Sequence, residues 1–236
     1  MLRWLVLYCG IMLLPALSLA DEPLRPFQAS YKTSVGLMSA TGERSLRPQE
    51  KNGQWLFASR ASVLGLAVTE QATIALRDNH IQSLSYNFVN PLSSKRNLSL
   101  RFDWPQHRLV DTQRGQSREL ADGTFDRLSF QLQLQRDVCQ PGGKFHEATY
   151  RLADANKFKT YNIELLGRES LKTSVGTLDT LKLRQYRPGK SGDALIWLAP
   201  AWDCLLVQLQ NRGDDDNQVL KLISATVDGR EVKGAR

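Results

Sequence analysis

Hydrophobic and polar residues alternate along most of this chain, and turn signals interrupt the alternation about every ten residues. The pattern is clearest between Thr173 and Gln210, where it predicts strands over 180–187, 194–198 and 204–210. Proline and glycine residues separate the first two of these strands, because they adopt the backbone angles that tight turns need. Short strands joined by tight turns are typical of an antiparallel meander.

The same alternation predicts strands on both sides of this central meander. They are expected at 27–33, 44–47, 57–63, 67–76, 81–88, 97–103, 109–111, 145–152, 161–169 and 218–227. The alternation within 81–88 is imperfect, which indicates a β-bulge there. No linker divides the chain, so we expect a single β-rich domain over 21–229 and a flexible polar tail over 230–236.

One segment, 124–138, has a different pattern, and its apolar residues recur with helical spacing. Asp122 or Thr124 can cap the start of a helix, and Asp126 would then sit in its first turn. Its alternate apolar residues would equally suit a strand, but a proline and two glycines after it end a helix well. The predicted fold is therefore mainly β, a curved antiparallel meander sheet or a partly open β-barrel, with one covering helix near 124–138.

The first 20 residues have the pattern of a secretory signal peptide. Arg3 precedes an apolar run that ends at Ser18-Leu19-Ala20, so cleavage is expected after Ala20. An uncleaved anchor is the alternative, but the run is shorter than the ~20 residues that span a membrane. Leu7-Tyr8 before Cys9 does not fit a lipoprotein signal. We expect a periplasmic protein with no transmembrane span in the mature chain.

Two cysteines follow the signal peptide, Cys139 and Cys204. In an oxidising compartment such a pair usually forms a disulfide, which here would contribute ~4 kcal/mol on the loop-entropy scale. The bond would tie the end of the predicted helix to the strand that begins at Cys204. A reactive thiol or a metal pair is the alternative, although no third cysteine or nearby histidine completes a site.

The formal net charge is +7, and its basic residues are spread along the chain. A diffuse positive charge on an exported protein favours anionic envelope components over nucleic acid as partners. The alternative is a solvated basic surface with no partner.

Signals for catalysis are few. His80, His107 and His146 are isolated in sequence, and no serine-hydrolase elbow is present. The acids at 214–216 are consecutive, whereas calcium loops place oxygen ligands at alternate positions. We therefore assign no catalytic, metal or cofactor-binding residues.

Aromatic residues are the more informative candidates. Trp55, Tyr86, Phe88, Phe102 and Trp197 lie on or beside predicted strands and form a possible ligand face. A curved sheet around an apolar ligand needs such residues on its concave face. The alternative is an ordinary core whose indole N–H groups are satisfied at its edge.

The order of several short motifs resembles the domain of unknown function 3108 family. These motifs are Phe27–Tyr31, Asp126–Ser129, Val175–Lys182 and Ile196–Leu198. Where relatives often carry a proline after the tryptophan strand, this chain has Leu205-Leu206-Val207. The resemblance covers essentially the whole mature chain. It implies an exported bacterial protein with a curved or barrel-like β fold and no established activity.

Three functions remain open at this point. The first is a non-enzymatic periplasmic protein that binds a lipid, a glycolipid or another envelope protein on the concave face of its sheet. The second is a structural or assembly factor of the envelope without a small ligand. The third is an enzyme whose site forms only in the fold, around His146 or His107.

Overall fold

The computed structural model describes residues 24–35, 38–51, 53–63, 65–140, 142–213 and 218–235. The predicted signal peptide and the acidic turn at 214–217 lie outside the described residues.

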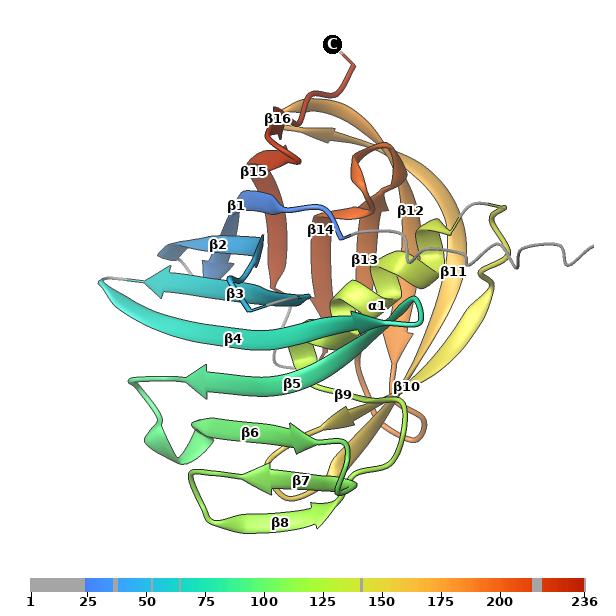
Figure 1. The fold of residues 1–236 in the computed structure, drawn as a ribbon. Coiled ribbons are helices and arrows are strands. Elements are labelled where there is room, and N and C mark those ends of the chain that lie inside the picture. The colour runs from blue at the N-terminus through green and yellow to red at the C-terminus, as the bar shows by residue number, and fades with distance from the viewer. Residues whose placement is uncertain are drawn as a thin grey trace, which may run out of the picture.

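The described residues form one 16-stranded sheet and a single α-helix (Figure 1). The strands before the helix are β1 (Phe27–Val35), β2 (Met38–Pro48), β3 (Gln54–Val63), β4 (Leu66–Arg77), β5 (His80–Val89), β6 (Leu98–Asp103), β7 (Arg108–Asp111), β8 (Gln116–Glu119) and β9 (Thr124–Phe125). The helix is α1 (Arg127–Cys139). The strands after it are β10 (Glu147–Ala153), β11 (Phe158–Thr173), β12 (Gly176–Tyr186), β13 (Asp193–Ala199), β14 (Leu205–Arg212), β15 (Val219–Val227) and β16 (Arg230–Glu231), and 3₁₀ turns lie at η1 (Ser94–Arg96) and η2 (Pro200–Trp202).

Strand β1 lies in the middle of this sheet, and β2 to β8 follow it outward to one edge. The chain then crosses to β9 at the opposite edge, and β10 to β15 run inward until β15 pairs with β1. The strand order is β8-β7-β6-β5-β4-β3-β2-β1-β15-β14-β13-β12-β11-β10-β9, with β16 beside β15. Neighbours are antiparallel except β9 and β10, which are parallel. The predicted mainly β, curved and partly open sheet with one helix is confirmed. The bulge expected within 81–88 is also present. Thr73 of β4 pairs with Ser85 and the next residue, Ile74, pairs with Ser83, so Leu84 of β5 is the extra residue.

The two ends of the sheet, β8 and β9, are not paired with each other, and a side chain bridges the gap near them. Arg118 of β8 donates hydrogen bonds to the carbonyl oxygens of Asp154 and Ala155, in the turn between β10 and β11. Its guanidinium also lies 4.8 Å from the centre of the Phe158 ring. The sheet is thus an open barrel whose seam is bridged by a side chain.

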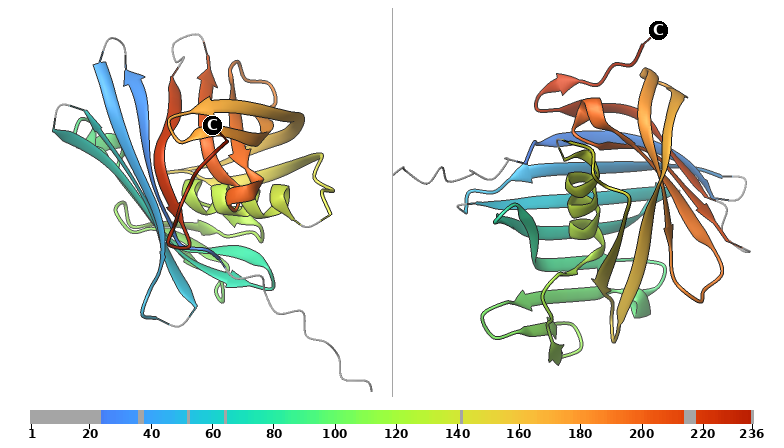
Figure 2. Two further views of the ribbon diagram at one scale, coloured as in Figure 1. Left: turned by 90° about the horizontal axis from the view of Figure 1, so that it is seen from above. Right: turned by 90° about the vertical axis from the view of Figure 1, so that its right-hand side faces the viewer.

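Helix α1 lies inside the curve of the sheet, between the β1–β8 half and the β10–β14 half (Figure 2). We call the face of the sheet that surrounds it the concave face. Leu132 of α1 faces residues near the N-terminus and β14, whereas Phe130 and Leu134 face β13. Because the helix is enclosed on most sides, its apolar residues with helical spacing and those at alternate positions are all buried. This explains why the sequence suited a strand as well.

The helix begins later than Asp122 or Thr124, the two predicted caps. Thr124 and Phe125 pair with Arg151 and Leu152 of β10, so the backbone is still extended there. Asp126 is the cap instead, and its carboxylate accepts hydrogen bonds from the backbone N–H groups of Leu128 and Ser129. Pairing with a distant strand, which the local pattern does not contain, moved the start of the helix.

The C-terminal residues, expected to form a flexible tail over 230–236, are instead paired with the sheet. Val232 is only 1% exposed. Thr177 and Ala235 exchange backbone hydrogen bonds of 2.7 and 2.9 Å, and the Gly234 N–H donates to Val175. A Cβ atom on Gly176 would lie 2.8 Å from the Gly234 oxygen, so this approach requires glycine. The contact joins segments far apart in sequence, which the polar composition of the tail does not predict.

We predict that Arg118→Ala destabilises the protein by about 1–3 kcal/mol, the usual cost of losing hydrogen bonds to a charged group. Urea unfolding followed by tryptophan fluorescence measures the change. The matched control is Arg101→Ala, which removes an ion pair to Asp103 from a side chain that is 56% exposed and should change stability by less than about 0.5 kcal/mol. Equal stabilities for the two variants would show that the seam is not bridged in this way.

Candidate functional site: an apolar cavity beside the helix

The concave face is not completely filled, and a cavity of about 170 Å³ remains between α1 and strands β10–β14. We call it the helix-side cavity. Its walls are apolar and its mouth is polar. It is lined by Arg127, Phe130, Gln131, Leu134, Gln135, Leu152, Tyr161, Gln185, Ala194, Ile196, Leu198, Leu206, Leu209 and Asn211. A cavity of about 150 Å³ holds a benzene molecule, so this one has room for a ring or the end of one acyl chain.

The register of β13 and β14 determines which of their side chains line the cavity. Ala194, Ile196 and Leu198 alternate along β13 and face α1. On β14 the wall residues are Leu206 and Leu209, three positions apart, because a register shift opposite Trp197 and Leu198 inserts one extra residue. The methyl group of Ala194 fills little space, which leaves part of the cavity open.

Other hollows are less suitable. A hollow of about 60 Å³ lies at the other end of α1, beside Cys139 and Leu205. A wider one of about 490 Å³ lies over β1–β4, and its lining is mostly polar, with residues such as Gln28, Arg44, Glu70 and Gln71. The first is too small for a ligand, and the second offers no apolar enclosure.

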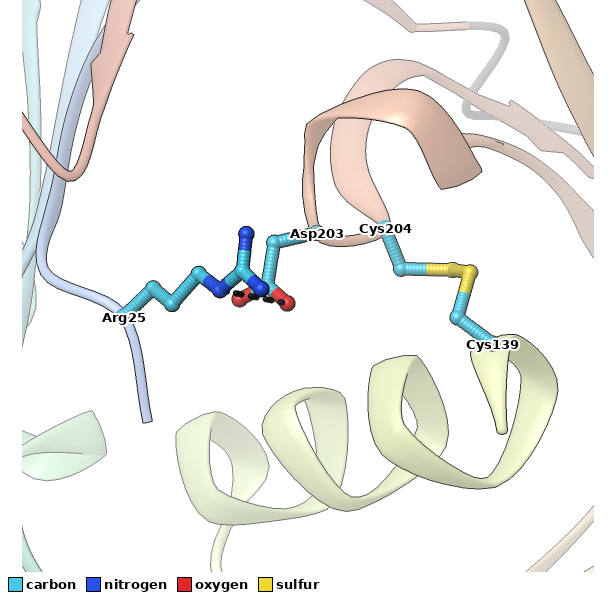
Figure 3. The surroundings of a disulfide bond; sticks show 4 residues. All are labelled: Arg25, Cys139, Asp203 and Cys204. Atoms are coloured by element: carbon cyan, nitrogen blue, oxygen red, sulfur yellow. Dashed lines mark ion pairs between the residues drawn. A yellow bond between two sulfur atoms is a disulfide. The ribbon is translucent and has the colours of Figure 1, made fainter. Parts of the chain in front are cut away.

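A disulfide fixes the C-terminal end of the helix, at the small hollow of about 60 Å³. Cys139, the last residue of α1, is bonded to Cys204, just before β14, with a Cα–Cα distance of 6.0 Å (Figure 3). The pair predicted from the sequence is thus present in the structure. Arg25 Nε lies 4.0 Å from a carboxylate oxygen of Asp203, the residue before Cys204. Figure 3 shows this ion pair beside the disulfide. The disulfide and this ion pair meet at the loop between η2 and β14.

Buried hydrogen bonds fix the N-terminal end of the helix. The Ser129 hydroxyl accepts a bond of 3.0 Å from the Asp126 N–H, completing a reciprocal capping box. Ser83 of β5 shares a 2.5 Å hydrogen bond with Ser129 and links the cap to the sheet. Burial raises the pKa of Asp126, and the hydrogen bonds that it accepts oppose this shift. Further along, the Gln133 side chain accepts a 2.7 Å bond from the Ile81 N–H.

A polar cluster lies next to the mouth of the cavity. Arg127 donates a 2.9 Å bond to the Tyr86 hydroxyl, which in turn donates a 2.8 Å bond to Glu70. Burial raises the pKa of Tyr86, so this phenol stays protonated. Arg44 of β2 donates to the side-chain oxygen of Gln131. The cluster contains two guanidinium groups and one carboxylate.

Four of the five predicted ligand-face residues lie on the concave face, on the opposite side of α1 from the helix-side cavity. Tyr86 and Phe88 are buried beneath Arg127, whose guanidinium lies 5.6 and 4.5 Å from the two ring centres. Phe102 is buried and stacks on Trp104, and Trp55 packs at the edge of the core. None of them is among the residues that line the helix-side cavity.

Trp197, the fifth residue of this set, lies on the other face of β13. Its indole N–H donates a 3.2 Å bond to Glu169, and the ammonium group of Lys182 lies 5.1 Å from its ring. Strand β13 is buried on both faces, so alternation alone could not tell which face its tryptophan would take. The structure therefore does not bring the five aromatic residues together.

The three histidines do not form a site. His80, His107 and His146 are all exposed and lie in separate segments. Within the described ranges, no group of three or more histidine, cysteine or acidic residues is arranged to hold a metal ion. No helix in that part of the chain is long and apolar enough to cross a membrane.

Sequence analysis missed both the cavity and Arg44. It predicted a strand over 194–198, but the run is apolar throughout and did not show that Ala194, Ile196 and Leu198 would line a cavity. A signal for Arg44 does exist in the sequence. Its side chain points from β2 to the concave face, at the alternate position between Gly42 and Leu46, where apolar residues are expected.

The fold and the enclosed helix define a barrel-like β protein. Residues 27–218 match the family described as protein of unknown function, DUF3108, and the chain belongs to this family. The resemblance inferred from the sequence motifs is thereby confirmed. No curated protein matches the sequence significantly.

Solved structures with a similar fold include a β-barrel-like protein of domain of unknown function DUF1849 from Brucella abortus. It has 11% sequence identity and a TM-score of 0.54, and the match covers 86% of this chain and 98% of that one. A candidate exported protein with a YmcC-like fold from Bacteroides fragilis has 11% identity, covers 90% and 98%, and has a TM-score of 0.37. A candidate lipoprotein from Parabacteroides distasonis has 12% identity, covers 87% and 97%, and has a TM-score of 0.38. The first of these supports the barrel-like fold.

We predict that replacing both cysteines, in the variant Cys139→Ala/Cys204→Ala, lowers the free energy of unfolding by about 2–4 kcal/mol, because the loop between them becomes free in the unfolded chain. Thermal unfolding with and without a reducing agent measures this. The reducing agent should lower the melting temperature of the wild type and leave the double variant unchanged. The role given to the disulfide would be contradicted if the reducing agent left the melting temperature of the wild type unchanged while thiol titration showed that the bond was broken.

Proposed function

We propose that the protein is a non-enzymatic, periplasmic binding protein that receives the apolar part of an envelope-derived ligand, an acyl chain, in the helix-side cavity. The observation that carries the proposal is an apolar cavity on the concave face that the helix leaves unfilled. Its polar mouth is formed by residues such as Arg127, Gln131 and Asn211. Apolar walls with a few polar groups at the entrance are typical of sites for small ligands.

Energetics favour an apolar occupant. Side chains that line an empty apolar cavity lack van der Waals partners on that side. Water gains little against the apolar wall, since Ile196, Leu198 and Leu206 offer no hydrogen-bonding side chains. A hydrocarbon chain end restores the lost contacts without any polar partner.

The proposed location rests on two features. Residues 1–20 have the pattern of a secretory signal peptide. The disulfide between Cys139 and Cys204 belongs to an oxidising compartment. Together they support the periplasm, where lipids and glycolipids of the envelope are available as ligands.

A partner protein of the envelope is the second candidate. At about 170 Å³ the cavity is smaller than the ~300 Å³ at which sites for whole small molecules begin, and it would accept one large apolar side chain. In that case the protein serves as an assembly factor, and a free acyl chain does not bind.

The test is a calorimetric titration of the wild type with decanol, a neutral straight-chain alcohol. We expect Ala194→Phe to weaken binding at least about tenfold, equivalent to about 1.4 kcal/mol, because the ring occupies the cavity. The matched control is Ala61→Phe, which adds the same ring at an exposed position of β3 and should leave binding unchanged. Failure of the wild type to bind decanol would reject the acyl-chain proposal in favour of a protein partner, and equal binding by the two variants would place the site elsewhere.

A further inference from the structure

Arg44 is a buried cation with no acidic side chain of the described residues within ion-pair distance. Burial lowers its pKa, although the charge of nearby Glu70 partly opposes that shift. Arg44 is 8% exposed. On the concave face it pairs with Ser59 of β3, which in turn pairs with Glu70 of β4, so the three residues form one row across the strands. Among the described residues, no carboxylate lies within ion-pair distance of it, and its Nε atom is buried with no hydrogen-bond partner. Glu70, the acid of this row, is 3.9 Å from Arg127 and accepts the bond from Tyr86.

A buried guanidinium without a counter-charge is costly. Removing an ion from water costs several kcal/mol, which only a paired charge and satisfied donors offset. The contacts of Arg44 offset part of this cost, through one bond to Gln131 and a position 4.9 Å from the centre of the Phe57 ring. A planar guanidinium has five N–H donors, a geometry that matches carboxylate and phosphate oxygens. The group is thus arranged to accept an anion.

Arg44 lines the wider hollow over β1–β4, and it is linked to the helix-side cavity through Gln131. Gln131, which accepts its hydrogen bond, lines the mouth of that cavity. Tyr31 of the neighbouring strand donates a 2.9 Å bond to the carbonyl oxygen of Leu206, a wall residue of the same cavity. Burial raises the pKa of Tyr31 to about 12, so its hydroxyl remains a neutral donor beside Arg44. An anionic group and an apolar chain can therefore be bound side by side.

We propose that Arg44 binds the anionic head, a carboxylate or a phosphate, of an amphiphile whose acyl chain enters the helix-side cavity. This inference rests on the proposed function and specifies the class of its ligand. Binding requires the Gln131 side chain to turn aside, because it now accepts the hydrogen bond that the anion would take.

The experiment compares decanoate with decanol by calorimetry at alkaline pH, where decanoate is ionised. Both have the same chain, so their ratio isolates the head group. We expect the wild type to bind decanoate about tenfold more tightly, as a charge-assisted pair implies. Arg44→Met and Arg44→Gln should abolish this preference and leave decanol binding unchanged. The matched control is Arg60→Met, on the exposed face of β3, which should keep the preference.

The stability of the unliganded variants separates binding from a structural role. Because Arg44→Met removes an unpaired buried charge and keeps an apolar contact with Phe57, we expect a melting temperature equal to or above that of the wild type. A loss of the decanoate preference accompanied by a lower melting temperature in both Arg44 variants would assign Arg44 a structural role and overturn the inference.

The remaining outcomes are distinct. Equal binding of decanoate and decanol by the wild type overturns the inference and leaves the proposed function intact. Binding of neither overturns the proposed function and the inference with it. Inorganic phosphate, a head group without a chain, should bind far more weakly than decanoate. Equal affinity for the two would identify a site for free anions and overturn the inference that the ligand is an amphiphile.

Discussion

The fold depends on the enclosure of one helix. A curved sheet of this length leaves its concave face exposed unless something fills it, and α1 supplies that filling. The helix is held at one end by the Asp126 cap and the Ser83–Ser129 hydrogen bond, and at the other by the Cys139–Cys204 disulfide. With both ends fixed, α1 cannot move toward β13 to close the remaining space. The helix-side cavity is a consequence of this constraint.

The same enclosure explains the polar groups inside the sheet. Gln133 and Ser129 are buried because α1 has little exposed surface, and each finds a hydrogen-bond partner on β5. Arg44 also faces the helix, where it bonds to Gln131 but has no carboxylate of the described residues within ion-pair distance. An apolar hollow and an unpaired cation on adjoining surfaces together suggest an amphiphilic ligand more strongly than either does alone.

Much of the fold could be predicted from the sequence because strand alternation, turn residues and the pairing of two cysteines are local or countable signals. The meander around Trp197 and the disulfide are examples. Features that depend on contacts between distant segments could not be predicted. The helix start moved to Asp126 because Thr124 pairs with β10, and the C-terminal residues are ordered because Ala235 reaches Thr177.

The candidate site was harder to predict for the same reason. The five aromatic residues were grouped because of their chemistry, yet the two buried faces of β13 send Trp197 away from the others. The cavity depends on what stands opposite Ala194, and the unpaired state of Arg44 depends on which partner Glu70 takes. Neither is a property of a residue and its neighbours in sequence.

Native mass spectrometry of the protein purified from the periplasm, followed by organic extraction, tests the central claim most directly. We expect a stoichiometric adduct that denaturation releases as an anionic lipid with an acyl chain. A clean mass of the protein alone, together with a melting temperature that added envelope lipids do not change, would contradict the account and favour a protein partner.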